Sequence, residues 1–443
     1  MYRLVVLCLV CVVGCARSGY DRAWVQRTVA QRTGHRLREE ARGPQDGASL
    51  PPGVDVSHGL TARDAVAIAL WNNPAFQAEL TQLGFARADL AEAGLLPNPT
   101  LALLLPLGPR QWEAWLAWPV EVLWQRPRRV AAARLDVERV ARGLVQTGLD
   151  LARDARLAHA ELVLAQRRGR LRREGADALE ALAALVEARW RAGDTGRPES
   201  AVARFEAGSA REAALRAEAE TEVARARLHM VMGVAELGRA VEALPPSEAA
   251  GEAPPLAALV TAALAARPDV RAAELAMEAA GARQGWERAR VLGALARLDA
   301  FGPAPEGAGP PQTSGRVGLQ MTLPLFNQNQ AGRARAEAEW ERAVWRYAQV
   351  RQQVVHEVTT ARAQAVQARA GLSVWRGTVM PAVEATMTDA AEALARGEAS
   401  RQPLLEATRR RLDAQVREAE LQAELSRAVA QLARSTGGHD AGG

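Results

Sequence analysis

Lysine is absent from this 443-residue sequence, in which all 56 basic residues are arginine. Aromatic residues make up only 4% of the chain, while Ala, Arg, Leu and Glu dominate. This composition favours long helices or coiled coils over a conventional packed core. The net charge of +5 first suggests nucleic-acid binding. The arginines, however, alternate with glutamates along helical stretches, which is typical of solvated, salt-bridged helix faces, so we expect no nucleic-acid partner.

Cysteine is confined to the first fifteen residues, at Cys8, Cys11 and Cys15. Its absence from the rest excludes a disulfide or a thiolate metal site there. No His, Met or Cys cluster suits a soft metal ion, and no nucleophile–base pair, phosphate loop or carboxylate pair stands out. We therefore expect no metal, no cofactor and no enzymatic activity. The isolated His159, His229 and His356 are expected to be surface or packing residues.

The first fifteen residues carry a targeting signal. A short positive start precedes an apolar run, Leu4 to Val13, that is too short to span a bilayer. Val12-Val13-Gly14-Cys15 is similar to a bacterial lipobox, which predicts a signal peptide over 1–14 and lipid attachment at Cys15. An ordinary signal peptide with an incidental cysteine is the alternative. Residues 15–58 lack periodicity and are predicted to be a lipidated, extended tether.

An internal duplication organises the remaining chain. Leu60 to Ala65 opens a helix with a Thr61–Asp64 capping box, and Asn73-Pro74 interrupts that helix. About 194 residues later, Leu264 to Asp269 repeats this pattern. Each copy continues with a helix, two strands, a very long helix and a returning helix. The predicted repeats cover 59–255 and 256–434, followed by a flexible tail over 435–443.

The two very long helices are predicted over 126–192 and 331–396, each about 100 Å long at 1.5 Å per residue. We expect Gly193 and Gly397 to end them in a left-handed conformation, and Pro381 to kink the second. Apolar or small residues recur along them every seven positions, which indicates packing along neighbouring helices. They are Val130, Val137, Leu144 and Leu151, then Val358, Ala365, Leu372 and Val379.

Four strands are predicted, and at least three alternate apolar and polar residues with a period of two. One apolar and one charged face is what a transmembrane barrel strand needs. Trp115 breaks the alternation, the first strand (about 99–107) has no readable register, and a soluble hairpin on the helices is the alternative. The candidates for the barrel lumen are Glu113, Glu121, Arg297, Asp299, Arg316 and Gln320. The candidate membrane-interface aromatics are Trp112, Trp118 and Trp124.

Four strands cannot close a barrel with a lumen, since about eight is the practical minimum. Open strand edges are also not tolerated in a bilayer. Several chains must therefore contribute to one barrel, and cyclic symmetry makes that assembly a ring. The residues themselves do not give the number of chains.

The order of these features resembles the TolC-like outer-membrane efflux protein family over about residues 59–434. The motifs are Leu60 to Ala65 with Asn73-Pro74, Gly94 to Thr100, and Leu323 to Gln330. The resemblance implies a mainly α fold with a small β part, in which duplicated strand–strand–long-helix units form a trimeric transmembrane β-barrel continued by a periplasmic α-helical barrel. It also implies a homotrimer lipid-anchored in the outer membrane and extending into the periplasm.

The implied function is a passive duct for a tripartite efflux system. Its partners would be outer-membrane lipid, a periplasmic adaptor (membrane fusion) protein and an inner-membrane pump of the resistance-nodulation-division type. Phe326 to Gln330 is most similar to the heavy-metal and cation efflux branch. A periplasmic coiled-coil lipoprotein acting as scaffold or adaptor is the alternative function. The two helical hairpins and the few strands count against it.

A gate is expected at the periplasmic tip, where a ring of like charges would select ions. The family often has acidic residues after the second helical turn. Here Glu406 is retained, but Pro403 stands at the other acidic place. Four further candidates could form salt bridges that hold the tip closed, although charges that complement the helix dipole are the alternative. They are Arg191, Asp194, Arg396 and Glu398.

Overall fold

The computed structural model describes residues 16–38, 47–105, 112–235, 242–245, 254–302, 314–396 and 401–438. The chain forms two compact units that interleave along the sequence. Unit 1 comprises Met1–Val25, Leu80–Leu144 and Pro268–Gln352, and unit 2 comprises Gln26–Glu79, Val145–Arg267 and Gln353–Gly443. Among the described helices, none combines the length and the apolar character needed to cross a membrane.

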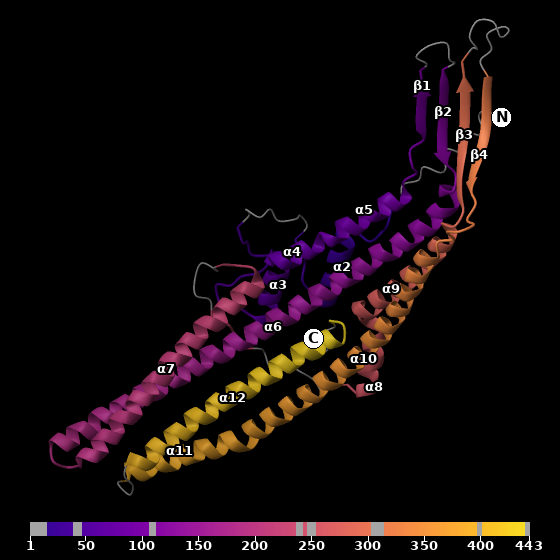
Figure 1. Cartoon of the computed structure of the whole chain (residues 1–443). Coiled ribbons are helices and arrows are strands. Elements are labelled where there is room, and N and C mark those ends of the chain that lie inside the picture. Colours follow the sequence, from indigo (N-terminus) through magenta and orange to yellow (C-terminus); the bar gives the residue numbers. More distant parts are fainter. Residues whose placement is uncertain are drawn as a thin grey trace. The chain divides into compact units, whose positions relative to one another are not determined.

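Unit 1 contains a four-stranded antiparallel sheet in the order β1-β2-β3-β4 (Figure 1). The strands are β1 (Thr100–Leu104), β2 (Glu113–Pro119), β3 (Gly293–Phe301) and β4 (Ser314–Thr322). The four predicted strands are confirmed, with β1 shorter than expected. The β2–β3 pairing joins the hairpin of the first repeat to that of the second, and β1 and β4 form the sheet edges.

The register of the sheet decides which residues share a face. Leu116 lies opposite both Leu101 and Leu298, and Leu298 lies opposite Val317. Directly opposed residues of antiparallel strands project to the same face. The predicted alternation is therefore confirmed. The open register of β1 is also resolved, because Leu101 falls on the apolar face.

Each strand of unit 1 adjoins one helix. Helix α5 (Gln82–Gly94) leads into β1, α6 (Val122–Arg191) follows β2, α9 (Pro268–Ala289) leads into β3, and α10 (Gln330–Val374) follows β4. Arg126 Nε and Arg129 Nε donate to the carbonyl oxygens of Gly94 and Ala93 at 2.7 and 3.0 Å. Basic side chains thus satisfy the exposed carbonyls where α5 ends.

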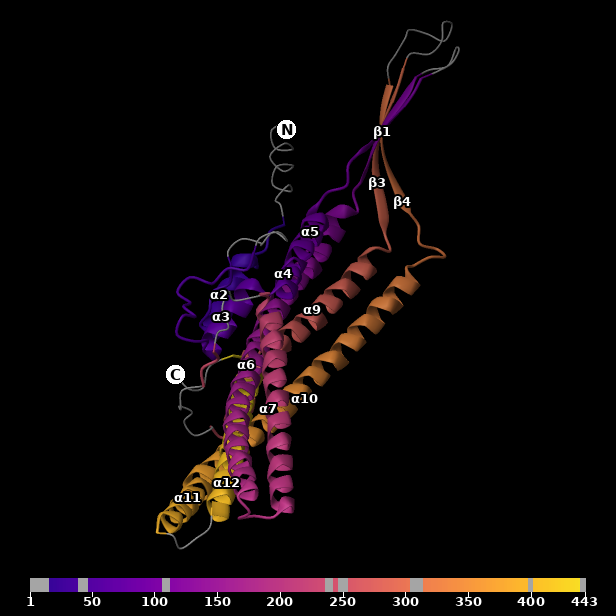
Figure 2. The ribbon, with the colours of Figure 1, turned by 90° about the vertical axis from the view of Figure 1, so that its left-hand side faces the viewer.

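Unit 2 contains two antiparallel helical pairs. The second part of α6 runs beside α7 (Arg197–Met232), as Figure 2 shows, and α11 (Met380–Ala395) packs on α12 (Arg401–Ser435). Small buried residues of α6 and α7, Ala183 and Ala203 among them, let those helices approach closely. Gly193 ends α6 with φ +85°, and Asp194 N–H donates to the Arg189 carbonyl. The predicted left-handed glycine is confirmed, whereas Gly397 lies outside the described residues.

The second long helix is interrupted in front of Pro381. Residues Trp375–Val379 form a π-helical turn between α10 and α11, and Met380 N–H donates to the Trp375 carbonyl five residues earlier. Proline lacks an N–H and crowds the preceding turn, which a wider turn relieves. The expected irregularity therefore falls at the predicted place, as a π turn within a continuing helix.

The duplication is visible in unit 2 as equivalent contacts before each repeated proline. Asn73 Nδ2 donates to the Val231 carbonyl at 2.8 Å, and Arg267 Nη1 donates to the Ser435 carbonyl at 3.2 Å. Val231 and Ser435 lie at the ends of α7 and α12. Among the smaller helices of this unit, α3 (Ala62–Asn72), α4 (Pro74–Leu80) and α8 (Leu256–Ala266) flank the proline breaks. The Thr61–Asp64 capping box is confirmed.

The prediction of an extended tether is wrong for residues 22–33, which form helix α2 (Arg22–Thr33). Val25 and Val29 are fully buried, and a Cβ on Gly148 would lie 3.2 Å from a Val29 methyl group. Those two valines supply the apolar contact that holds the helix on the body. The arginines and glutamines between them hide this short apolar stripe in the sequence.

Six of the eight predicted heptad positions of the long helices are core positions, whereas Leu151 and Val379 are half-buried. Val137 and Val358 are fully buried, and Leu144, Ala365 and Leu372 are each at most 7% exposed. Because the same seven-residue spacing predicted them, the coiled-coil-like packing is confirmed for these positions.

Candidate channel surfaces

The apolar face of the sheet is uncovered in the single chain. Val317, Leu319 and Leu298 are 87%, 63% and 50% exposed, and Leu101 is 70% exposed. A contiguous band of large aliphatic side chains on one face of a sheet marks a surface that water does not cover in the working molecule. Its strand register matches the lipid-facing side of a membrane barrel.

The opposite face carries charged residues arranged around two aromatic rings. The Arg297 guanidinium lies 5.0 Å from the centre of the Trp115 ring, and its Nε donates to Asp299 Oδ1 at 2.5 Å. Arg316, which lies opposite Asp299, stacks 5.2 Å from the Phe301 ring centre. Trp115 thus occupies the polar face as a cation–π partner, which explains why it breaks the alternation.

The remaining lumen candidates divide into two groups. Glu113 and Gln320 lie on the same polar face by register. Glu121 lies beyond β2, and its carboxylate accepts the Ala294 N–H at 3.2 Å, so it completes the ladder at the strand end. A lumen position for all six residues stays a prediction.

Two of the three predicted interface tryptophans flank β2. Trp112 immediately precedes the strand, and Trp118 lies near its other end, where its Nε1 donates to the Pro97 carbonyl at 2.9 Å. Six residues of strand span about 20 Å, close to the ~25 Å apolar band of membrane barrels. Trp124 lies in α6 and donates to the Ala289 carbonyl at 3.4 Å.

Sequence reasoning missed that exposed apolar residues continue beyond Leu323, at Leu325 and Phe326. Leu323, Leu325 and Phe326 are 71%, 73% and 94% exposed. The sequence does contain the pattern that could have predicted this extension, a run of large apolar residues interrupted only by Pro324. Phe326 lies four residues beyond the end of edge strand β4.

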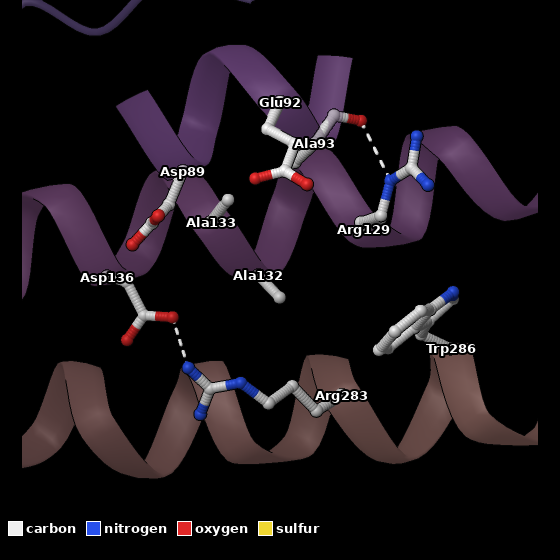
Figure 3. Close-up of a pocket in the computed structure, with 9 residues that line it drawn as sticks. All are labelled: Asp89, Glu92, Ala93, Arg129, Ala132, Ala133, Asp136, Arg283 and Trp286. Carbon is white, nitrogen blue, oxygen red and sulfur yellow. Dashed lines mark hydrogen bonds and ion pairs between the residues drawn. The ribbon is translucent and has the colours of Figure 1, made fainter. Parts of the chain in front are cut away.

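A cleft of about 320 Å³ lies among α5, α6 and α9 in unit 1 (Figure 3). An Arg283–Asp136 ion pair bridges α9 and α6, and Arg129 reaches the Ala93 carbonyl. Asp89 and Glu92 line the opposite wall. The described residues contain no cluster of His, Cys, Asp and Glu side chains suited to a metal ion. The side chains of this cleft brace the helices that carry the strands.

The gate candidates at the helix ends pair within their own helices. Arg191 Nη2 lies 2.6 Å from Glu187 Oε1, and Arg396 Nη1 lies 3.6 Å from Glu392 Oε2. Glu406 Oε1 accepts from Arg410 Nη2 at 2.5 Å. Exposed pairs of this kind hold the side chains weakly, so they remain available to other partners. Glu398 and the lipidation candidate Cys15 lie outside the described residues, and the gate roles of the other four candidates stay predictions.

A buried charge network links four helical segments of unit 2. Arg267, 1% exposed, donates to Glu357 Oε2 at 2.6 Å, and Arg434 donates to the same carboxylate. Arg434 Nε also lies 2.7 Å from Asp150 Oδ1. Burial alone would raise the pKa of Glu357, but hydrogen bonds from Arg267 and Gln353 with the nearby arginine charges lower it overall. These ion pairs connect α6, the end of α8, α10 and α12 within unit 2.

His159 is confirmed as a packing residue. Its side chain is 2% exposed, and Nε2 lies 2.8 Å from the Leu60 carbonyl oxygen. Burial lowers the pKa of the imidazole, although the Leu60 hydrogen bond and the Asp64 charge act in the opposite direction.

Comparison with known proteins shows what this sequence and this fold are similar to. Residues 259–438 match the family model "Outer membrane efflux protein". The solved outer-membrane channel OprN is 21% identical with a TM-score of 0.68, covering 91% of this chain and 99% of its own. VceC from Vibrio cholerae is 17% identical with a TM-score of 0.69, and the match covers 86% of this chain and 96% of VceC. The open MtrE channel of Neisseria gonorrhoeae is 16% identical with a TM-score of 0.66, and the match covers 91% of this chain and 96% of MtrE.

A search of curated protein sequences finds no match. The fold is that of these solved outer-membrane proteins. The resemblance to the TolC-like outer-membrane efflux proteins is confirmed, through the second repeat by the family model and through nearly the whole chain by the fold.

Proposed function

We propose that this chain is the outer-membrane duct of a tripartite efflux system and works as a homotrimer. The observation that carries the proposal is the sheet, which combines an exposed apolar face, a charged opposite face and two open edges. A bilayer accepts such a sheet only as part of a closed barrel. Three copies would supply twelve strands, above the practical minimum of about eight.

The duct conducts passively, and energy comes from an inner-membrane pump of the resistance-nodulation-division type through a periplasmic adaptor. The helical turns at Gly193 and after Ala395 are the proposed docking and gating tips. Lipidation at Cys15 would hold the protein in the inner leaflet of the outer membrane. The cargo class proposed from Phe326 to Gln330 is heavy-metal or other cations, carried as substrate.

The test is purification from outer-membrane detergent extracts. We expect a heat-modifiable oligomer that gives single-channel conductance in planar bilayers. A soluble monomer after removal of residues 1–15 would contradict the proposal. Crosslinks from the adaptor to the barrel end alone would contradict the proposed docking tips.

A further inference from the structure

The two edges of the sheet each adjoin a helix with an unpartnered face. Helix α5 leads into edge strand β1, and α10 leaves edge strand β4. Each chain contributes an even number of strands, so a ring of copies pairs β4 of one with β1 of the next in antiparallel fashion. That closure brings the start of α10 beside α5 of the neighbouring copy.

Each of these helices packs against its own chain on one face only. On α5 the buried positions are Leu83, Ala86, Leu90 and Ala93. On α10, Ala336 is buried and the Trp340 ring lies 3.7 Å from a Cβ built on Gly281 of α9. The opposite faces carry small exposed residues, which permit close helix approach. They are Gly84, Ala88 and Ala91 on α5, and Ala334 and Ala338 on α10.

Large apolar side chains accompany both small faces. Phe85 on α5 is 63% exposed, and Trp345, one helical turn beyond Glu341 on the same face of α10, is 70% exposed. Exposed aromatic rings beside small residues are typical of an interface, in which a ring fills the space left by the small side chains.

The charges that flank the two faces are complementary only for antiparallel helices. Helix α5 runs toward the sheet and α10 runs away from it, so side chains on corresponding flanks meet. On one flank, Glu92 of α5 then meets Arg335 and Arg342 of α10. On the other flank, Arg87 meets Glu337. A parallel arrangement would instead place Glu92 beside Glu337.

These five side chains form no ion pair within the described part of the chain. Many other arginines of the long helices pair with carboxylates, as Arg173 does with Glu218. We infer that the α5 face Gly84-Ala88-Ala91 and the α10 face Ala334-Ala338-Glu341 form the seam between neighbouring copies, with Glu92–Arg335/Arg342 and Arg87–Glu337 pairs across it. The inference rests on the proposed oligomeric duct and names its contact.

Disulfide crosslinking tests the seam directly. The chain has no native cysteine after Cys15, so A88C can be combined in turn with A334C, A338C and E341C. At least one pair should give covalent dimers and trimers under oxidation that reducing agent dissolves. A88C with E339C, which lies on the opposite side of α10, is the matched control. Crosslinking only with E339C, or with none of the positions, overturns the inference.

Charge reversal tests the pairing. E92R should reduce the fraction of protein that migrates as an oligomer in unheated samples several-fold, and so should R335E/R342E. The combined variant should recover most of the loss. Since Glu92 also lines the cleft of Figure 3, an effect exerted through the cleft would not be rescued, and that result overturns the pairing.

The two proposals fail separately. If the wild-type protein forms conducting oligomers but the cysteine variants give no seam crosslinks, the proposed duct is kept and the proposed seam is wrong. A wild-type monomer without conductance removes both.

Discussion

The buried carboxylate of Glu357 gives the sharpest test of how unit 2 is held together. Glu357 accepts from Arg267 and Arg434, which are 1% and 11% exposed, and is itself 16% exposed. Glu357→Gln keeps the size and one acceptor oxygen but removes the charge. Arg434 keeps Asp150 as a partner, whereas Arg267, which also donates to the Ser435 carbonyl, loses the charge of its Glu357 partner. The substitution therefore removes a carboxylate charge from beside a guanidinium that is only 1% exposed.

Breaking a buried ion pair from one side costs about 3–5 kcal/mol, because an uncompensated charge stays in a low-dielectric site. Arg267→Met in the same background also removes the buried positive charge. The double variant R267M/E357Q should then be more stable than E357Q, recovering roughly half of the loss. The Arg434–Asp150 pair survives in both variants.

The assay is thermal unfolding of the detergent-solubilised protein, followed by helical circular dichroism. We expect E357Q to lower the apparent midpoint by at least about 5 °C. Glu212→Gln, which disrupts an exposed pair with Arg216, is the matched control and should leave the midpoint unchanged. An E357Q midpoint equal to wild type, or a double variant less stable than E357Q, would refute this account of the network.

Four further predictions concern pH, gating, the membrane face and the anchor. The lowered pKa of Glu357 stabilises the fold above its ordinary value of 4.5. That stabilisation is lost as pH falls through the lower pKa of the folded state, so the unfolding midpoints of wild type and E357Q should converge only at a pH well below 4.5. Glu406→Ala should weaken cation preference in planar-bilayer reversal potentials, and unchanged selectivity removes Glu406 from the gate. Leu319→Arg on the lipid face should cost about 2–4 kcal/mol and reduce oligomer yield. Gln320→Arg on the other face should be tolerated, and equal losses would contradict the assignment of faces. Cys15→Ser should abolish radiolabelled fatty-acid incorporation, and persistent labelling would place the lipid elsewhere.

Much of the fold was predictable because it depends on local periodicity. The period of two in β3 and β4, the heptads through Val137 and Val358, and the capping box at Thr61 each need only neighbouring residues. The tether prediction failed at residues 22–33 because two buried valines fix that helix, and their contacts come from distant parts of the chain.

The candidate sites were predictable only where a face could be read from the alternation. Arg297, Asp299 and Arg316 fall on one face by register alone, but the stacking of Arg297 on Trp115 needs the β2–β3 pairing. The buried network around Glu357 had no sequence signal. Nothing in the sequence around Arg267 distinguishes it from the other arginines, because its partners come from segments far apart in the chain.

The sequence by itself determined the repeat, the long helices, the alternating strands and the arginine-glutamate surfaces, because each follows from spacing along one segment. Tertiary structure alone decided the order of the strands and which residues of β1 lie on the apolar face. It also decided where α2 packs and which partner each buried charge has. Those features depend on which distant segments meet, and spacing within a segment carries no information about that.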